Sequence, residues 1–436
     1  MLYDVIIIGG GTSGCAAAYT AGKLGLKTLI IEKNIHLGGA ITSGLVIPVM
    51  YSGQNQINTE FYDDLILELK NIGGQITYQN NSGWFNPELT KIALDKLMQK
   101  AGVDVLFNAS VKMINYKDKI IESIELDQPI LSPCIDTIRT NNISSLDHNL
   151  LSVCIGAKWF IDATGNCEFS KNLNCEILND CSEYQPMSLR FIMSGVDKKR
   201  FANWIIDYDS DRNVTTVEEI DGDVHFSTAY TWDTNKHWAL APLFDDAVNK
   251  NILKDSDRNY FQLFTVAGMP ESVAFNCPRI IQNLDPNCVK DISLAAIEAR
   301  ESILRLSNFC RQYLPGFEKA FISNIADELG IRVSHRIRGK YVYTIDDLKT
   351  GKKFENPALI SNYPIDIHNN NKNASCCEKT GEYQLPLESL MSYNYDNLFV
   401  IGRCLSADYK SQGALRVQAS CFSMGEAVAK YISNSA

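Results

Sequence analysis

The chain has 436 residues, of which 45% are hydrophobic and 21% are charged, and its formal net charge is −10. These values are ordinary for a globular protein and exclude a disordered chain, while the negative charge disfavours a broad nucleic-acid surface. The length suits two interleaved domains better than one core. No run reaches the roughly 18 apolar residues that a membrane span needs.

The beginning of the chain and its cysteines bear on its location. Residues Met1–Asp4 lead directly into an apolar run, without the basic region and long apolar stretch of a targeting signal. Thirteen cysteines are scattered without a CxxC pair, which fits a reducing compartment and argues against a dithiol or zinc-ribbon site. We therefore expect a cytoplasmic protein without a metal site.

The most informative stretch is Val5–Gly14. Its β-branched run predicts a buried parallel strand, and its glycines predict the turn into a helix that binds a dinucleotide. Gly9 permits the tight turn, Gly11 leaves room for a pyrophosphate, and Gly14 allows close packing of helix on strand. The helix start at Thr12 and Ser13 would then face two phosphates with free amides and a positive dipole end.

A second strand, Lys27–Ile31, ends in Glu32 and Lys33. An acid at about this distance from the glycines meets a ribose hydroxyl, and it would repel a 2′-phosphate. FAD or NAD is therefore expected, and NADP is not. A glycine-rich turn that binds nothing would leave the acid unexplained.

The next loop contains paired glycines and hydroxyls, with Gly39, Ala40 and Thr42 as candidate ligand contacts. Together with Val5–Gly14, it resembles the FAD-dependent oxidoreductases of the glutathione-reductase structural class. That resemblance implies FAD as the dinucleotide, with this loop running along the ribityl chain and the flavin.

The segment Phe85–Val111 predicts a helix followed by the third strand of the nucleotide-binding sheet. Asn86-Pro87-Glu88 is a start signal, and the expected apolar face consists of Leu89, Ile92, Ala93, Leu97 and Met98. The resemblance implies that Val111 contacts the adenine through its backbone. An ordinary core valine is the alternative.

Between Lys112 and Ile161, alternating runs predict a β-meander that is interrupted by a polar loop near Thr140–Asn149. It ends in an apolar strand followed by Ala163, Thr164 and Gly165. This small turn would lie at the carboxyl edge of the sheet, where dinucleotides bind. The resemblance places it beside the nucleotide.

Residues 167–390 do not continue the alternating strand–helix pattern. They contain a strand-like run, Met187–Met193, a long helix from Lys290 through Tyr313, and a polar stretch, Asn369–Asn373. We therefore predict an α/β fold in which residues 1–166 and 391–436 form a discontinuous Rossmann-like FAD-binding domain. Its parallel sheet carries the β-meander, and residues 167–390 form an inserted α+β substrate or cap domain.

The end of the chain repeats the strand–glycine–helix pattern. A buried strand meets Gly402 and Arg403, and a helix is expected to open after a second glycine. The resemblance implies that this segment rejoins the first sheet and faces the flavin's pyrimidine end. The candidate cofactor residues here are Gly402, Arg403, Gly413, Ala414, Leu415, Arg416 and Val417.

Further motifs narrow the resemblance to a large, mostly uncharacterised bacterial FAD-dependent oxidoreductase family and extend it over nearly the whole chain. They include Ser188–Phe191, Tyr313–Phe317, Gly330–Arg332 and Arg336–Tyr341. Two departures concern the site: Arg403 stands where many relatives of the wider class have an acid, and Asn166-Cys167-Glu168 replaces an acidic, glycine-rich turn.

A second dinucleotide fingerprint is missing from the sequence. Electrons must therefore enter or leave through the substrate pocket, or by contact with oxygen, a quinone or a partner protein.

The densest candidate for the substrate pocket is Arg332–Tyr341. In a strand, Arg332, Ser334, Arg336 and Arg338 would share one face, and their guanidinium groups could clamp a carboxylate or phosphate. A solvated edge strand is the alternative. Arg190 could add a fourth cation, or it could form an ion pair in the core. His335 could act as an acid or a base, or it could be a core residue whose hydrogen bonds are satisfied.

We therefore expect an FAD-dependent oxidoreductase that acts on a small, polar, anionic substrate by hydride transfer to or from flavin N5. The sequence does not identify its electron donor or acceptor, and no nucleic-acid partner is expected. A tRNA-modifying flavoprotein and a non-enzymatic binding protein that keeps the fold are the alternatives.

Overall fold

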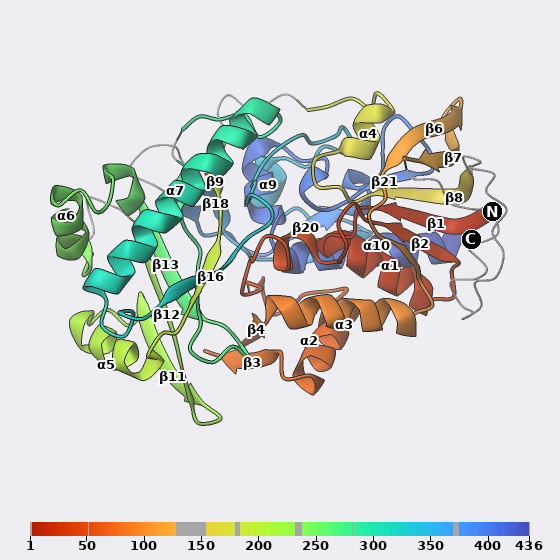
Figure 1. Ribbon diagram of the computed structural model, residues 1–436. Coiled ribbons are helices and arrows are strands. Elements are labelled where there is room, and N and C mark those ends of the chain that lie inside the picture. Colours follow the sequence, from red (N-terminus) through yellow and green to blue (C-terminus); the bar gives the residue numbers. More distant parts are fainter. Residues whose placement is uncertain are drawn as a thin grey trace.

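The computed structural model describes residues 2–50, 52–127, 154–178, 184–231, 238–280, 282–368 and 375–435. It has two lobes (Figure 1). One contains both chain ends and a largely parallel sheet, and the other contains an antiparallel sheet. Within the described ranges, no helix combines the length and hydropathy that crossing a membrane requires.

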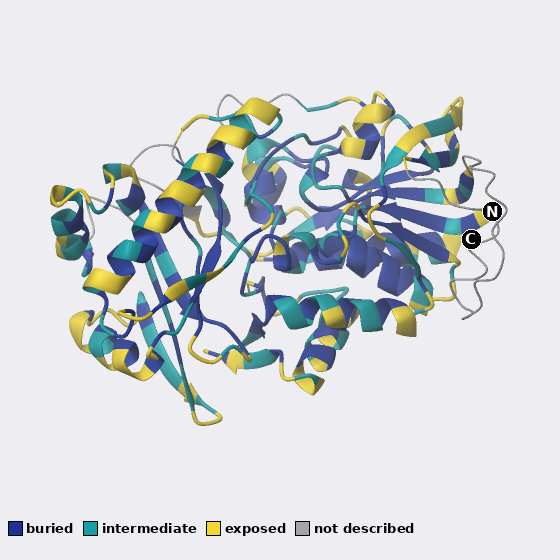
Figure 2. Ribbon diagram, viewed as in Figure 1, coloured by how far each residue is buried: buried dark blue, intermediate teal, exposed yellow. Residues whose placement is uncertain are grey.

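The first lobe is built on a seven-stranded sheet with the order β5-β2-β1-β8-β7-β6, and β21 pairs with β8. The strands that pair in parallel are β1 (Leu2–Ile8), β2 (Thr28–Ile31), β5 (Asp104–Leu106), β8 (Ile155–Asp162) and β21 (Leu398–Val400). They are mostly buried on both faces (Figure 2), as their β-branched runs predict. The parallel sheet, with β5 as its third predicted strand, is confirmed.

Helices from both ends of the chain pack together beside this sheet. They are α1 (Thr12–Lys23) and α10 (Gln418–Ser435). Their backbones are so close that a Cβ on Gly425 would lie 2.3 Å from the carbonyl oxygen of Ser13. The predicted return of the carboxyl-terminal segment to the first sheet is therefore confirmed.

The predicted β-meander is also present. β6 (Val111–Lys117) and β7 (Ile120–Leu126) pair antiparallel, and β7 pairs antiparallel with β8. The polar loop expected near Thr140–Asn149 lies outside the described residues. The short helix α4 (Glu168–Asn172) follows β8.

Between β2 and β5 the chain forms α2 (Glu60–Asn71), the hairpin β3 (Gln75–Tyr78) and β4 (Asn81–Phe85), and α3 (Pro87–Lys100). The start signal of α3 is confirmed, because Asn86 Oδ1 accepts hydrogen bonds from the amides of Glu88 and Leu89. The expected apolar face is wrong at Ile92, which is 50% exposed, because the buried stripe runs through Thr90, Ala93, Leu94 and Leu97.

The second lobe contains a six-stranded sheet with the order β11-β12-β13-β14-β10-β16. Its strands are β10 (Phe191–Ser194), β11 (Thr215–Ile220), β12 (Asp223–Thr231), β13 (Tyr260–Thr265), β14 (Val273–Phe275) and β16 (Phe321–Ile325). The single strand expected over Met187–Met193 is wrong. It is divided into β9 (Met187–Ser188), which pairs with β15 (Arg279–Ile280), and β10. Arg190 lies in the break.

Helices α5 (Lys198–Tyr208), α6 (Ala241–Asn249) and α7 (Val289–Tyr313) belong to this lobe. The long helix α7 confirms the prediction for Lys290–Tyr313. It buries Ala295, Ala299, Ile303 and Leu306 and exposes its other face, as Figure 2 shows.

The chain also contains several shorter elements after β16. They are α8 (Ile345–Thr350), β17 (Pro357–Ser361), β18 (Ile365–His368), β19 (Ser375–Glu378), β20 (Tyr383–Pro386) and α9 (Tyr409–Leu415). β17 packs on α10 and β18 on α9. One hydrophobic core runs through both lobes, and the domain boundaries at 166 and 391 stay a prediction. The Asn369–Asn373 stretch lies outside the described residues.

Candidate functional site

The glycine turn after β1 has the packing that a diphosphate site requires. Gly9 has φ +102°, and a Cβ there would lie 2.6 Å from the carbonyl oxygen of Ala163. At Gly14 a Cβ would lie 2.0 Å from the carbonyl oxygen of Gly9. At Gly11, however, a Cβ would meet nothing nearer than 4.0 Å. The first and third glycines are therefore needed for packing, whereas Gly11 faces open space.

The first turn of α1 suits an anion. No side chain in the described part of the chain caps it, and the turn contains no acidic residue. Thr12 and Ser13 are buried there, with Thr12 Oγ1 3.5 Å from the carbonyl oxygen of Gly38. Uncapped amides and a positive dipole end at an open glycine are the features that bind a phosphate. The residues present therefore fit the diphosphate of a dinucleotide.

Glu32 is 6% exposed and holds the glycine turn in place. Its Oε2 accepts a hydrogen bond from the amide of Gly10 at 2.7 Å, and its Oε1 accepts one from the amide of Asn34 at 2.8 Å. Each oxygen keeps a lone pair that a ribose hydroxyl can use. The structure thus gives this acid a role in the turn that its position in the sequence did not reveal.

Two other candidates lie near the same edge. The ammonium group of Lys33 is exposed and lies 3.7 Å from a carboxylate oxygen of Glu168. Val111 begins β6, where it pairs with Leu126 and packs against the core.

The loop after Glu32 closes over the glycine turn. Gly38 forms a parallel bridge with Gly11, and Gly39 begins the 3-10 helix η1 (Gly39–Ile41). Ala40 is exposed, while Thr42 is buried and donates from Oγ1 to the carbonyl oxygen of Leu37 at 2.7 Å. The carbonyl oxygens of Gly39 and Ala40 accept hydrogen bonds within the loop, from the amides of Thr42 and Val46. Thr42 therefore supports the loop.

The returning carboxyl-terminal segment touches the same place. η4 (Gly402–Cys404) begins at Gly402, where φ is +74° and a Cβ would lie 2.6 Å from Ser13 Oγ. The helix expected to open at Gly413–Val417 is placed wrongly. Gly413, Ala414 and Leu415 end α9, Arg416 and Val417 form the connection, and α10 begins at Gln418. Gly413 sits inside a helix because α9 packs closely on β18 there.

The turn Ala163-Thr164-Gly165 is held by Asp162, a buried carboxylate. Asp162 accepts hydrogen bonds from Thr164 and, through Oδ2, from the amide and hydroxyl of Ser170. Burial raises the pKa of this carboxyl above its usual value. The turn is therefore a rigid edge of the site.

Arg403 ties this turn to the second lobe. Its Nε donates to the carbonyl oxygen of Gly165 at 2.8 Å, its Nη2 to Asn166 Oδ1 at 2.6 Å, and its Nη1 to the carbonyl oxygen of Ile331. The two departures seen in the sequence, Arg403 and Asn166, thus form one hydrogen-bonded unit. The guanidinium is used largely in internal contacts.

The strand expected over Arg332–Tyr341 is wrong. In the described structure this segment makes isolated bridges but no continuous ladder. Arg332, Ser334 and Arg336 are buried, and so are Val333 and Ile337, because protein covers the segment on both sides. The alternation therefore does not create one cationic face.

Its arginines go to three different places. Arg336 is 1% exposed and donates from Nη1 to the carbonyl oxygen of Ala407 at 2.6 Å. Arg338 is exposed and pairs with Glu176 at 3.0 Å. Arg332 donates from Nη1 to the carbonyl oxygen of Pro186 at 2.6 Å and lies near other arginines.

His335, the predicted acid or base, is partly buried. Burial and the nearby Lys171 lower the pKa of its imidazole. Its carbonyl oxygen accepts a hydrogen bond from Cys167 Sγ at 3.2 Å. His335 thus lies on the side of the segment where Cys167 packs.

A cluster of four arginines, hereafter the arginine cluster, forms where the two lobes meet: Arg190, Arg279, Arg332 and Arg416. Burial, followed by Arg279, Arg416 and Arg190, lowers the pKa of Arg332 well below its usual value. Burial, together with Arg279 and Arg416, lowers the pKa of Arg190 to about 10, so that its guanidinium stays charged at neutral pH. The arginines are therefore close enough to repel one another.

Three backbone segments bring these side chains together. Arg279 pairs with Ser188 in the β15–β9 ladder, and Ser188 bridges Gly330. The guanidinium carbon of Arg279 lies 3.4 Å from the ring centre of Tyr260, within the range of a cation–π contact. Arg279 was not among the residues predicted from the sequence, because no local pattern marks it.

Asp366 and His368 on β18 complete the cluster. Asp366 accepts a hydrogen bond from Arg416 Nη2 through its carbonyl oxygen at 3.0 Å, and its Oδ2 lies 3.3 Å from His368 Nε2. Burial alone would raise the pKa of Asp366, but His368, Arg416 and Arg332 outweigh it and hold the pKa low. Burial, Arg332 and Arg279 lower the pKa of His368 well below its usual value.

The segment Asp327–Arg332 connects the cluster with the predicted flavin loop. The amides of Asp327 and Glu328 donate to the carbonyl oxygen of Ser43, at 2.9 and 3.3 Å. At its other end, the carbonyl oxygen of Arg332 accepts a hydrogen bond from Gln412 Nε2 on α9. The arginine cluster therefore lies one chain segment away from the loop at residues 39–44.

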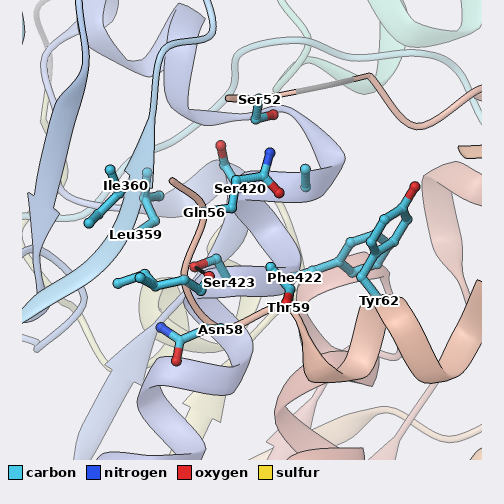
Figure 3. A pocket seen from close by; sticks show the side chains of 12 residues that line it. Ser52, Gln56, Asn58, Thr59, Tyr62, Leu359, Ile360, Ser420, Phe422 and Ser423 are labelled. Atoms are coloured by element: carbon cyan, nitrogen blue, oxygen red, sulfur yellow. Dashed lines mark hydrogen bonds between the residues drawn. The ribbon is translucent and has the colours of Figure 1, made fainter. Parts of the chain in front are cut away.

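A small pocket beside α10 is a different feature (Figure 3). The side chains of Ser52, Gln56 and Ser420 lie around it, and the ring of Tyr62 stacks on Phe422 with centroids 5.7 Å apart. Its volume of about 10 Å³ holds one water at most. It is therefore too small for a flavin or a substrate.

Over the described ranges, no group of three or more His, Cys, Asp or Glu side chains is arranged to hold a metal ion.

Curated relatives match a part of the chain. Thiamine thiazole synthase from Saccharolobus solfataricus is 26% identical over 163 residues, 37% of this chain and 55% of that protein. The enzyme of the same name from Methanococcus vannielii is 28% identical over 168 residues, 37% of this chain and 56% of that protein. The chain thus spans about half the length of the curated relatives it matches.

Two solved structures are similar over the whole chain. A geranylgeranyl bacteriochlorophyll reductase-like protein from Thermoplasma acidophilum has 15% identity and a TM-score of 0.47, covering 100% of this chain and 78% of that one. The flavin-dependent brominase Bmp2 has 12% identity and a TM-score of 0.48, covering 100% and 79%.

A family model described as FAD dependent oxidoreductase matches residues 4–435. The match includes the glycine turn, both lobes and the returning carboxyl-terminal segment. The chain therefore belongs to the FAD dependent oxidoreductase family, and it is an enzyme that uses FAD.

Proposed function

We propose that this enzyme oxidises or reduces a small anionic substrate bound at the arginine cluster. The observation that carries the proposal is the position of the cluster: buried guanidinium groups lie one segment, Asp327–Arg332, away from the loop at residues 39–44. Buried cations need an anionic partner. When bound, FAD supplies a donor or acceptor of hydride at flavin N5.

On the cofactor side, we assign the diphosphate to Gly11, Thr12 and Ser13, where the turn is open and the amides are uncapped. Glu32 would accept from the ribose while it keeps the turn closed. Gly39, Ala40 and the start of α10 at Gln418 would flank the flavin. The finer resemblance to the glutathione-reductase structural class is part of this proposal.

On the substrate side, the assignment changes from the one based on sequence. Arg332 is kept as an orienting residue, and Arg190 joins it. We now assign Arg336 a structural role in place of a substrate-binding one, because it is 1% exposed and donates a hydrogen bond to a backbone carbonyl oxygen. For a proton released or taken up with the hydride, His368 is a better candidate than His335, because it lies against the cluster.

Anaerobic bleaching tests the proposed function. The purified protein should be yellow, and its flavin bands should bleach without oxygen when the correct small carboxylic acid or phosphate ester is added. Neutral alcohols and amines of the same size should leave the spectrum unchanged. Bleaching by a neutral compound but by no anion would contradict the proposal.

The same preparation separates the alternatives. A colourless protein that cannot be reconstituted with FAD would favour a binding protein, and retention of tRNA through purification would favour a tRNA-modifying enzyme. The cytoplasmic location and the absence of a nucleic-acid partner stay predictions from the sequence.

A further inference from the structure

We propose that the arginine cluster binds a doubly charged anion, either two carboxylates on one short carbon chain or a single phosphate group. This inference rests on the proposed anionic-substrate function and deepens it by naming the charge that the substrate must carry.

The balance of charge at the cluster favours a doubly charged ligand. In the described part of the chain, Arg416 contacts the carboxylate of Asp366, whereas Arg190 and Arg332 form no ion pair. Arg190 and Arg332 are buried, with exposures of 9% and 7%. Burying a charge without a partner is costly. A singly charged ligand would leave one of these two guanidinium charges uncompensated, whereas a doubly charged ligand neutralises both.

Arg190 is also suited to bind an anion. Its guanidinium makes no hydrogen bond or ion pair with any described residue, although its backbone carbonyl accepts one from Ala326. A Cβ at Gly330 would lie 2.9 Å from Arg190 Nη1, so the glycine at 330 leaves space for this group. A guanidinium that the protein keeps charged and leaves without a partner is suited to a planar oxyanion.

Neutral polar atoms around the cluster also favour a ligand with several oxygen atoms. Gln185 Nε2 and Ser188 Oγ are buried and have no hydrogen-bond partner among the described residues. Gln185 is 3% exposed, and its Oε1 accepts from the amide of His368, while Ser188 is fully buried and pairs with Arg279. Arg416 Nε is likewise buried without a partner. Unsatisfied buried donors of this kind are rare and costly, and a ligand with several oxygen atoms would satisfy them.

The diphosphate of FAD is not the expected source of these charges. The amides proposed to bind it lie at Gly11–Ser13, whereas the cluster lies beyond the segment Asp327–Arg332. A second anionic group is therefore required, and the substrate is the molecule that must come close to the flavin.

The test is a binding titration of the FAD-loaded protein with acetate, succinate and inorganic phosphate at constant ionic strength. At pH 8 succinate and phosphate are doubly charged and acetate is singly charged. Perturbation of the flavin absorbance reports binding. We expect succinate or phosphate to bind about tenfold to a hundredfold more tightly than acetate, since the second charge gains charged hydrogen bonds. If succinate binds more tightly than phosphate, the substrate is a dicarboxylate. If phosphate binds more tightly, the substrate carries a phosphate group.

The variant Arg190→Gln should remove this preference and leave the flavin content unchanged. Arg338→Gln is the matched control, because Arg338 belongs to the same arginine-rich segment but is exposed and paired with Glu176. It should keep the wild-type preference. If Arg190→Gln does not fold, Ser188→Ala still tests the inference. It removes a hydroxyl that has no hydrogen-bond partner among the described residues and should weaken binding of the doubly charged anion by about threefold or more.

The outcomes separate the two proposals. Equal binding of acetate and succinate, with no change in Arg190→Gln or Ser188→Ala, would overturn the doubly charged substrate and leave the anionic-substrate function standing. A fully FAD-loaded protein whose spectrum responds to none of the three anions would overturn both.

Discussion

The glycine turn and the arginine cluster are built in opposite ways. The turn is one continuous stretch, Val5–Gly14, which Glu32 fastens and whose glycines pack closely on the backbone of Ala163. The cluster joins side chains from separate segments, through Gln185–Arg190, Arg279, Arg332, Asp366 and Arg416. The turn proposed to hold the diphosphate is thus encoded mainly by one stretch of sequence, whereas the proposed substrate site depends on how the lobes meet.

The largest effect is expected at the glycine turn. In Gly14→Ala the new methyl group would overlap the backbone carbonyl of Gly9, at 2.0 Å, and neither backbone can move without opening the sheet. We expect a loss of about 3 kcal/mol or more in stability, together with loss of bound FAD, measured by chemical denaturation and flavin content.

Gly381→Ala is the matched control, because a Cβ there would meet nothing within 4 Å. It should unfold like the wild type and keep its flavin. If Gly14→Ala also behaves like the wild type, the close packing of α1 on the turn is wrong.

The second-largest effect tests whether Arg336 has a structural role and lies outside the substrate site. Arg336→Ala removes a buried side chain and leaves the carbonyl oxygen of Ala407 without its donor. We expect a destabilisation of about 3 kcal/mol, seen as a lower denaturation midpoint. If the variant is fully stable and has a raised KM, Arg336 binds the substrate and its structural role is wrong.

Arg332→Gln should show the reverse pattern. Arg332 is part of the arginine cluster, so the variant should raise KM for the anionic substrate about tenfold to a hundredfold, with unchanged flavin content. A change in kcat alone would contradict an orienting role.

The pH dependence of stability tests His368. Its pKa is lowered in the folded protein, so the unfolded chain binds the proton more readily below about pH 6.5. Stability should therefore fall as the pH falls from 6.5, by up to about 2 kcal/mol at pH 5 for this residue. His368→Gln should reduce that loss in denaturation curves at pH 8 and pH 5. If the loss of stability between pH 8 and pH 5 is the same in His368→Gln as in the wild type, the pKa of His368 is not lowered in the folded protein.

The smallest effect is expected at Glu32. Glu32→Gln keeps one carbonyl oxygen for a backbone amide but loses the charge, so FAD should bind about tenfold more weakly. Dialysis against buffer without FAD measures the loss. If the variant keeps all of its flavin, the proposed contact between Glu32 and the ribose is wrong.

The fold could be predicted from the sequence where local pattern and long-range packing agree. The run Val5–Ile8, the start signal at Asn86 and the helix at Lys290–Tyr313 each combine a periodic apolar pattern with a suitable boundary. The return of the carboxyl-terminal strand could be inferred because its glycine pattern repeats the first one.

The arginine-rich segment could not be read in the same way. Its alternation suggested a strand with one polar face, but the protein covers both sides, so that Arg332 and Val333 are both buried. Arg279 carried no signal, since it becomes a neighbour of Ser188 only through the β9–β15 pairing. Contacts of this kind are set by the tertiary structure and leave no local period.

A crystal structure of the FAD-loaded protein, soaked with whichever of succinate and phosphate binds more tightly in solution, would test the central claim most directly. The account predicts the diphosphate on the amides of Gly11–Ser13, the flavin ring beside Gly39–Ala40, and the soaked anion on Arg190. A diphosphate bound elsewhere, or the anion absent from the arginine cluster while the flavin is in place, would contradict it.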